Sequence, residues 1–242
     1  QKTTQICRYG HLLCDRTNDL VGQSMALYGE YAQPKIDFFA KLLVPGATAL
    51  DIGAHIGECS VGLAHIVGET GEVIAIEAMP DAFQCLQTNA QRNGLIQVRC
   101  INASVGNSTE DIPLWMLQSY ASKLALAVSE SYWTDRVSAL TLDGLNLSRC
   151  DLLRINLEGH EISVLQGAVT LIKKYKPFIC IENFRQSASS GIIYFLQKLN
   201  YEWMVHQTPL FNAGNYALNS ENIFADACSV SILATPKVMM DS

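Results

Sequence analysis

Five short apolar runs, separated by segments of helical periodicity, constrain the fold of this chain more than any other feature. The runs cover residues 47–52, 73–77, 98–102, 152–157 and 178–182. Several of them are rich in valine and isoleucine, which is typical of strands that are covered on both faces. Strands that alternate with helices form βαβ units and hence a parallel sheet. The sequence therefore predicts an α/β fold with a doubly wound sheet.

Two of the intervening segments have clear helical signals. Residues 81–92 are followed by Asn93-Gly94, a pair that commonly ends a helix. After His160, apolar residues recur at steps of three and four as far as Tyr175, and Pro177 follows. We therefore predict one amphipathic helix from His160 to Tyr175.

Composition limits the class of protein. The 242 residues carry a net charge of −6, and 49% are hydrophobic against 17% charged. This balance argues against disorder and against a nucleic-acid partner. No run approaches the roughly 18 apolar residues of a membrane-spanning helix, and the first ten residues lack the apolar region of a secretion signal. None of the eight cysteines forms a C-x-x-C pair, so we expect reduced thiols and a cytoplasmic protein.

The stretch Asp51-Ile-Gly-Ala-His-Ile-Gly57 is the most informative for function. It ends the first predicted strand and opens a helix. Gly53 and Gly57 permit positive φ and a close approach of a ligand to the backbone. His55 stands between them, where related motifs often have a third glycine. We therefore assign Asp51, Gly53, Ala54, His55 and Gly57 to a cofactor site.

The second predicted strand supplies an acid at the matching place. Glu77 ends that strand, and an acid there accepts hydrogen bonds from the ribose hydroxyls of a nucleotide. The alternative is that Glu77 only begins the helix ahead of Pro80. We extend the predicted cofactor site to Ala78 and Met79, which follow Glu77, and to Ala103, which follows the third strand.

The loop favours S-adenosylmethionine over NAD. It does not match G-x-G-x-x-G, whose amides receive a pyrophosphate, and the charge of Asp51 would repel that group. The same charge attracts an ammonium group, directly or through water, and S-adenosylmethionine carries an ammonium, a sulfonium and a ribose. Within the segment Tyr28-Gly29-Glu30-Tyr31, Glu30 and Tyr31 are predicted cofactor contacts that cover its amino-acid end; the alternative is a surface helix that packs its aromatic side chains inward. Asn156 is a further predicted contact. An NAD-dependent dehydrogenase is the weaker alternative.

Longer motifs resemble the FkbM family of S-adenosylmethionine-dependent methyltransferases. LDIGAHIGECS resembles the family's first motif, and Thr141-Leu142-Asp143 resembles its T-L-D turn. RINLEGHEISVLQGA, residues 154–168, resembles its K-I-D-x-E-G-x-E-x-x-V-L-x-G-A signature. KPFICIEN, HQTPLFNAGNYALNSENIF and NDLVGQSMALYGEY are also similar to family segments.

The resemblance implies a class I methyltransferase fold, a seven-stranded sheet with its last strand antiparallel. It also implies methyl transfer to a hydroxyl of a sugar, a glycan or a polyketide-like natural product, with S-adenosylhomocysteine as the second product. Two positions depart from the signature, because Arg154 and Asn156 stand where the family usually has Lys and Asp. Arginine keeps the charge with a different geometry. Asn156 removes a carboxylate from the carboxyl end of a strand, where open sheets bind substrates, and this motivates the alternative of a binding module that no longer catalyses.

Methyl transfer to an alcohol needs an aligned acceptor and a group that takes its proton. We favour Glu158 or His206 for the proton, and we include Asn156 and Glu182 as further catalytic candidates. The alternatives are structural roles: Glu158 would be a charge that stabilises the start of the following helix, and His206 would be a histidine at the end of a strand that bonds to the backbone. Glu161 is expected to be a helix-start carboxylate. A Mg²⁺ site is the weaker alternative to metal-free transfer, since hard cations prefer oxygen ligands; its ligands would be Asn156, Glu182 and Asn183.

We expect a single domain over residues 1–242. Within it, residues 1–45 are predicted to form a helical lid segment, and residues 104–145 a variable insertion on the substrate side. The segment from Asn212 to Asn222 is rich in amides, which suit sugar hydroxyls but also make turns.

Overall fold

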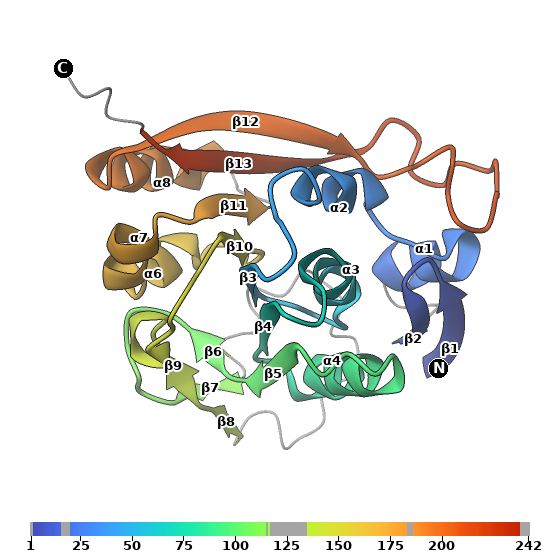
Figure 1. The fold of residues 1–242 in the computed structure, drawn as a ribbon, viewed down its shortest axis with the longest axis horizontal. Helices are drawn as coiled ribbons and strands as arrows, with labels where there is room; N and C mark the ends of the chain where they lie inside the picture. The colour runs from blue at the N-terminus through green and yellow to red at the C-terminus, as the bar shows by residue number, and fades with distance from the viewer. Residues whose placement is uncertain (1, 16–19, 115, 117–134, 183–185, 238–242) are drawn as a thin grey trace.

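The computed structural model describes residues 2–15, 20–114, 116, 135–182 and 186–237. Its centre is a seven-stranded sheet with the strand order β12-β13-β11-β10-β3-β4-β5 (Figure 1). The strands are β3 (Thr48–Ile52), β4 (Glu72–Glu77), β5 (Val98–Asn102), β10 (Leu152–Ile155), β11 (Phe178–Glu182), β12 (Tyr201–Pro209) and β13 (Cys228–Pro236). Neighbours from β11 through β5 are parallel, whereas β13 runs antiparallel to both β11 and β12. The predicted class I methyltransferase topology is confirmed.

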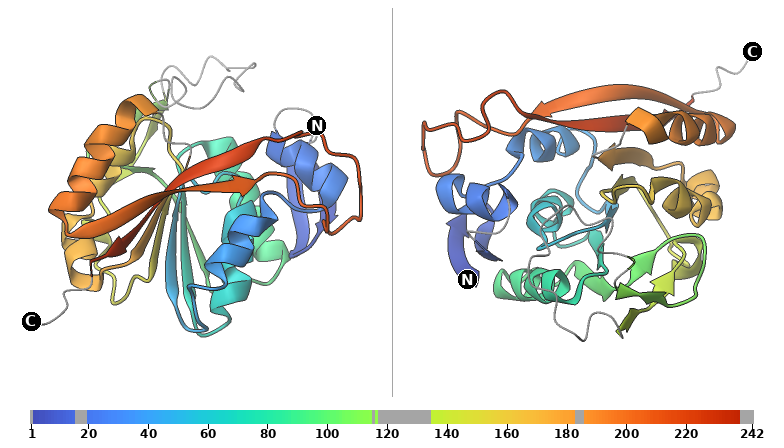
Figure 2. Two further views of the ribbon diagram at one scale, coloured as in Figure 1. Left: turned by 90° about the horizontal axis from the view of Figure 1, so that it is seen from above. Right: turned by 180° about the vertical axis from the view of Figure 1, so that it is seen from behind.

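Helices cover both faces of this sheet (Figures 1 and 2). The helices α2 (Gln33–Phe39) and α3 (Glu58–Val67) pack on the face that carries Ala49, Leu152 and Cys180. The opposite face, with Leu50, Leu153 and Ile181, packs on α6 (Glu161–Gln166), α7 (Val169–Tyr175) and α8 (Gln186–Lys198). Strands β3 and β10 are buried along their length. Strands β4 and β11, whose sequences are rich in valine and isoleucine, are buried after their first residue, as predicted for a sheet covered on both faces. Helix α4 (Pro80–Arg92) agrees with the predicted range and lies against β4 and β5.

The predicted helix from His160 to Tyr175 is two helices, with the break at Gly167 and Ala168. A Cβ on Gly167 would lie 1.9 Å from the carbonyl oxygen of Gly106. The Asp143 carboxylate accepts hydrogen bonds from the first amides of α7, from Thr170 at 3.0 Å and from Leu171 at 2.8 Å. The helix is therefore interrupted by contacts with Gly106 and Asp143, which are distant in sequence, whereas the spacing of apolar residues alone predicts one continuous helix.

The N-terminal segment differs from the helical prediction over its first part. Residues 2–15 form an antiparallel hairpin of β1 (Lys2–Cys7) and β2 (Gly10–Asp15), and only then follow α1 (Leu20–Tyr28) and α2. The loop between β12 and β13 reaches over to α1, as Figure 2 shows. Ala217 N donates to Tyr28 O at 3.0 Å, and the Tyr28 hydroxyl donates to Glu221 O at 2.7 Å.

The segment predicted as a substrate-side insertion contains short strands where it is described. These are β6 (Ser104–Val105), β7 (Ile112–Pro113), β8 (Arg136–Val137) and β9 (Ala139–Leu140), followed by a 3₁₀ turn at Asp143–Leu145. Residues 115 and 117–134 lie outside the described residues. All eight cysteines are free thiols, and six of them are buried. Among the helices in the described ranges, none has the length and apolarity needed to cross a membrane.

Candidate functional site

The loop after β3 is packed so closely that two of its positions require glycine. Gly53 has a φ of +77°, and a Cβ there would lie 2.3 Å from the carbonyl oxygen of Asn156. Gly57 has a φ of +87°, and its Cβ would lie 2.6 Å from Leu86 Cδ1. His55 adopts a φ of +53° while carrying a side chain. Such left-handed backbone is strained for a non-glycine residue and clusters at functional sites.

Glu77 fastens this loop to the end of β4. Its carboxylate oxygens accept hydrogen bonds from the amides of His55 and Met79, both at 2.8 Å. Burial raises the pKa of Glu77, and the Met79 amide opposes that rise. A carboxylate has about four lone-pair positions, so Glu77 retains acceptor capacity for hydroxyl donors. Ala103 N donates to Glu77 O at 3.3 Å, which brings Ala78, Met79 and Ala103 beside the loop.

Asp51 points into the protein. It has no exposed surface, and Ser60 Oγ donates to its Oδ2 at 2.5 Å. Arg154 is its neighbour in register on β10 and forms a salt bridge with its Oδ1. Direct contact between Asp51 and an ammonium group of a ligand is therefore disfavoured, because the carboxylate is fully buried among its protein partners.

The same network continues from Arg154 to Glu182 and Lys35. Arg154 Nε lies 2.7 Å from Glu182 Oε1, and Lys35 Nζ lies 2.6 Å from Glu182 Oε2. Lys35 Nζ also donates to Ser229 Oγ at 2.9 Å. Burial by itself would raise the pKa of Glu182, but the two cations outweigh it and lower this pKa to about 2. Glu182 is thus held as a paired carboxylate, which argues against the predicted roles of proton acceptor and metal ligand.

Of the remaining catalytic candidates, Asn156 and Glu158 lie at the carboxyl edge of the sheet. Asn156 directly follows β10, and Glu158 is half-buried in the turn before α6. His206 lies within β12, with its ring stacked on Phe38 at 4.9 Å between centroids and its Nδ1 3.1 Å from Thr208 Oγ1. Since β13 and β11 separate β12 from β10, about 14 Å of sheet lies between His206 and the end of β10. The structure does not bring His206 to Glu158.

The residues predicted for a Mg²⁺ site do not form one cluster of described ligands. Within the described ranges, no group of three His, Cys, Asp or Glu side chains is arranged to hold a metal ion. Both oxygens of Glu182 are paired with cations. Asn183, the third predicted ligand, lies outside the described residues.

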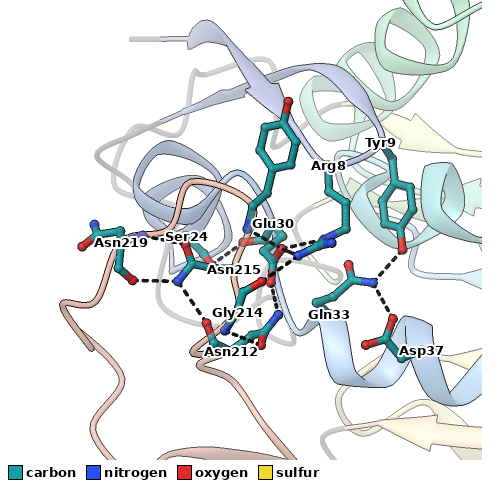
Figure 3. Close-up of polar contacts among 11 residues, drawn as sticks. Arg8, Tyr9, Ser24, Glu30, Gln33, Asp37, Asn212, Gly214, Asn215 and Asn219 are labelled. Atoms are coloured by element: carbon teal, nitrogen blue, oxygen red, sulfur yellow. Dashed lines mark hydrogen bonds and ion pairs between the residues drawn. The ribbon is translucent and has the colours of Figure 1, made fainter.

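Glu30 joins the N-terminal segment to the loop between β12 and β13 (Figure 3). Its Oε2 accepts from Arg8 Nε at 2.7 Å and from Tyr216 N at 2.9 Å, and its Oε1 accepts from Asn212 Nδ2 at 2.8 Å. The carboxylate is therefore occupied by three residues from two parts of the protein, the N-terminal hairpin and the β12–β13 loop. This arrangement argues for a structural role of Glu30 rather than the predicted ligand contact.

The side-chain amides of the β12–β13 loop are used in contacts within the protein, and several of these contacts are inside the loop itself. Asn215 Nδ2 donates to the carbonyls of Asn212 and Asn219, at 3.0 and 2.7 Å. The Asn222 side chain bonds to the main chain two and three residues ahead. Of the two interpretations of this amide-rich segment, turn formation agrees with these contacts.

A narrow cleft adjoins the glycine loop, between the β1–β2 hairpin, the α1–α2 connection and the start of α3. Its lining residues include Tyr9, Tyr31, Gln33 and Glu58. Glu58 is 8% exposed, and its Oε2 has no hydrogen-bond partner in the described part of the chain. His55 Nδ1 is 4.0 Å from this oxygen. Burial raises the pKa of Glu58, and the neighbouring His55 opposes the rise.

The sequence motifs do not single out Glu58 as a site residue, although its position in the chain could have suggested it. The residue directly follows Gly57 and is the first residue of α3. A carboxylate at that position is usually explained by the helix dipole. Only the packing of the hairpin over α3 shows that this carboxylate is buried beside a cleft.

Comparison with known proteins identifies the family. The model of the FkbM methyltransferase domain matches residues 51–203, which is more than half of the chain. The chain belongs to the FkbM family of methyltransferases.

Solved methyltransferases share the fold of this FkbM chain. The FkbM methyltransferase of Methylobacillus flagellatus matches with a TM-score of 0.53 at 16% identity, over 81% of this chain and 50% of that one. This chain thus spans about half the length of that protein. The precorrin-6y C5,15-methyltransferase of Geobacter metallireducens matches with a TM-score of 0.56 at 12% identity, over 93% of each chain.

Two further proteins are similar to this chain, one in fold and one over a short stretch of sequence. TYW2 of M. jannaschii, solved in complex with AdoMet, matches with a TM-score of 0.51 at 14% identity, over 96% of this chain and 84% of that one. A protein-L-isoaspartate O-methyltransferase of Caenorhabditis elegans is 36% identical over 58 residues, which are 24% of this chain and 26% of that protein. This chain therefore covers only about a quarter of that curated relative.

The FkbM signature combines packing residues with residues at the site. The Asp143 carboxylate of the T-L-D turn accepts hydrogen bonds from the first amides of α7. Gly167 has no side chain and so leaves space for the carbonyl oxygen of Gly106. Arg154, which replaces the usual lysine, bridges Asp51 and Glu182. Asn156 stands where the family usually has aspartate, and its main-chain carbonyl oxygen lies against Gly53 of the glycine loop. The two departures therefore fall on the buried ion-pair network and on the carboxyl edge of the sheet.

Proposed function

We propose that this FkbM-family chain is an S-adenosylmethionine-dependent O-methyltransferase that acts on a hydroxyl of a sugar, a glycan or a polyketide-like natural product. The observation that carries the proposal is the loop after β3. Gly53 and Gly57 leave no room for a Cβ, and Glu77 fixes the loop at the end of β4 through two backbone amides. Such a loop lets a ligand approach the backbone closely.

The chemistry of the surrounding residues fits S-adenosylmethionine. Glu77 has acceptor capacity left for ribose hydroxyls, with Ala78, Met79 and Ala103 beside it. The Glu58 carboxylate borders the adjoining cleft with one oxygen unpartnered among the described residues, which suits a cationic ligand. When bound, S-adenosylmethionine supplies a methyl group activated by a sulfonium.

The chain's own residues then have three tasks. The backbone of residues 53–57 and the carboxylate of Glu77 hold and orient the cofactor. Asn156, at the end of β10, orients the acceptor through its amide, which both donates and accepts hydrogen bonds. Glu158 accepts the proton of the acceptor hydroxyl, because it is a carboxylate at the carboxyl edge where open α/β sheets bind substrates.

Charge and composition support a neutral or small acceptor. The net charge of −6 disfavours polyanions such as nucleic acids. In a single domain of this length, segment 104–145 is the part of the chain that we assign to acceptor recognition. The eight free thiols support a reducing compartment such as the cytoplasm.

A binding module that has lost catalysis is the second candidate function. It is favoured by Asn156, where the family usually has a carboxylate, and by Glu182, whose carboxylate is paired with Arg154 and Lys35. An NAD-dependent dehydrogenase has no support from the family match.

Mass spectrometry of an acceptor panel tests the proposal. The protein is incubated with S-adenosylmethionine carrying a deuterated methyl group and with a panel of glycans and polyketide alcohols. We expect one labelled methyl group on an oxygen of the product, located by fragmentation, and a rate that falls at least tenfold in Glu158→Gln. Transfer to carbon or nitrogen would contradict O-methylation, and transfer at an unchanged rate by Glu158→Gln would remove the assigned base.

A further inference from the structure

Among the described residues, the wall of the cleft beside the glycine loop includes a buried carboxylate oxygen that has no hydrogen-bond partner. Of the other polar groups on its wall, Gln33 Nε2 donates to the Tyr9 hydroxyl at 2.6 Å and to Asp37 at 2.8 Å (Figure 3). Glu30 is paired with Arg8 at 2.7 Å. Glu58 Oε2, by contrast, has no hydrogen-bond partner within the described residues.

Burying a carboxylate oxygen without a partner raises the free energy of the folded state, because the oxygen loses its hydrogen bonds to water and forms none in the protein. The side chain of Glu58 is 6% exposed. The nearest cation-capable atom, His55 Nδ1, is 4.0 Å away, beyond hydrogen-bond distance. Such an orphaned group in a native protein calls for an explanation, and a ligand that donates to it is a sufficient one.

The shape and charge of the cleft define that ligand. Its free volume is about 10 Å³, enough for one group of the size of water or ammonium. Tyr9 and Tyr31 are among its lining residues, and aromatic residues at a binding site favour cations. The Glu30–Arg8 pair is neutral as a unit, so Glu58 gives the cleft its negative charge. A small cationic donor fits this site better than a neutral one.

We propose that the Glu58 carboxylate receives the α-ammonium group of S-adenosylmethionine, the contact for which Asp51 is the sequence-based candidate. This inference rests on the proposed function. Glu58 directly follows Gly57, so its cleft adjoins the loop that would hold the cofactor. Asp51 has no exposed surface and lies between Arg154 and Ser60, so a ligand ammonium could reach it only by displacing protein atoms.

Isothermal titration calorimetry with three probes tests the proposal on the full chain. The probes are S-adenosylhomocysteine, its deamino analogue, in which a hydrogen replaces the ammonium, and 5′-methylthioadenosine, which lacks the amino-acid part. The wild-type protein is expected to bind S-adenosylhomocysteine at least tenfold more tightly than the deamino analogue. In Glu58→Gln, a nearly isosteric change, we expect the affinity for S-adenosylhomocysteine to fall 10–100-fold, as for a charge-assisted hydrogen bond of about 1.5–3 kcal/mol. The affinities for the other two probes are expected to stay within about twofold.

Glu161→Gln is the matched control, because Glu161 is also the buried first residue of a helix and also has an oxygen without a hydrogen-bond partner. It is expected to bind all three probes like the wild type. Equal affinity of wild type and Glu58→Gln for S-adenosylhomocysteine would overturn the inference alone, since the cofactor would still bind. So would equal affinity of the wild type for S-adenosylhomocysteine and its deamino analogue, a comparison that holds even if the variant fails to fold. Absence of binding of every probe to the wild type would overturn the proposed function and this inference with it.

Discussion

Removing the charge of Lys35 tests the buried ion-pair network of Asp51, Arg154, Glu182 and Lys35 most sharply. Lys35 lies on α2 and is 6% exposed, and its Nζ lies 2.6 Å from Glu182 on β11. Lys35→Met keeps an unbranched stem of similar length but removes the ammonium. Glu182 then remains buried with Arg154 as its one cationic partner.

The magnitude follows from two lines of reasoning. Breaking a buried ion pair by removing one partner typically costs about 3–5 kcal/mol, because the other charge is left uncompensated. Independently, the pKa of Glu182 falls from 4.5 to about 2 on folding. At about 1.4 kcal/mol for each pKa unit this corresponds to about 3 kcal/mol, which is the net of the two cations and the opposing effect of burial. We therefore expect Lys35→Met to lower the free energy of unfolding by about 3 kcal/mol at pH 7.

Urea unfolding followed by circular dichroism measures this loss, with Lys41→Met as the control. Lys41 is exposed just beyond α2, so its substitution is expected to change the free energy of unfolding by less than about 0.5 kcal/mol. Because the pKa of Glu182 is lowered in the folded state, its stabilisation is present above pH 4.5 and is lost as the pH falls towards 2. The difference between wild type and Lys35→Met should accordingly shrink as the pH falls from about 4.5 towards 2. A loss below about 1 kcal/mol at pH 7, or a difference that does not change with pH, would refute the assigned role of the network.

Three further substitutions test separate parts of the account. Gly53→Ala is expected to lower the free energy of unfolding by about 2–5 kcal/mol, because the strain of a positive φ adds to a collision with Asn156 O. Thermal unfolding should show a smaller loss of stability in the control Gly94→Ala, whose glycine has a positive φ but open space around it. Equal losses in the two variants would argue against the collision. Asp143→Ala should cost about 1–2 kcal/mol by leaving the first amides of α7 without their acceptor, and an unchanged urea midpoint would contradict that cap. Glu158→Gln should lower kcat at least tenfold while the affinity for S-adenosylhomocysteine stays within about twofold, and a selective loss of cofactor affinity would move Glu158 from the acceptor side to the cofactor side.

The centre of the sheet was predictable from sequence because strands β3, β4, β10 and β11 are buried over nearly their whole length. Runs of valine, isoleucine and leucine carry that information locally, and the predicted ranges at residues 98–102 and 178–182 agree with β5 and β11. The break between α6 and α7 was not predictable from periodicity, because it depends on Gly106 and Asp143, which are distant in sequence. The N-terminal hairpin was not predicted, for a related reason. Its strands have one face covered mainly by α1 and α4, which local composition does not reveal.

The candidate site was only partly predictable. The positions of the glycine loop and of Glu77 follow from the order of strand, turn and helix. The partners of the charged residues do not, because Lys35 and Glu182 are 147 residues apart in the chain. One rule would have helped: Asp51 and Arg154 stand opposite each other on neighbouring strands, and facing side chains at the same level of a sheet interact. Motif spacing therefore located the site, and only packing showed which carboxylates are already paired.

Calorimetric titration of the protein with S-adenosylhomocysteine and, separately, with NAD tests the central claim most directly. The account predicts saturable one-to-one binding of S-adenosylhomocysteine, weakened at least tenfold by Glu77→Ala, and much weaker or no binding of NAD. Tighter binding of NAD, or binding of S-adenosylhomocysteine that Glu77→Ala leaves unchanged, would contradict it.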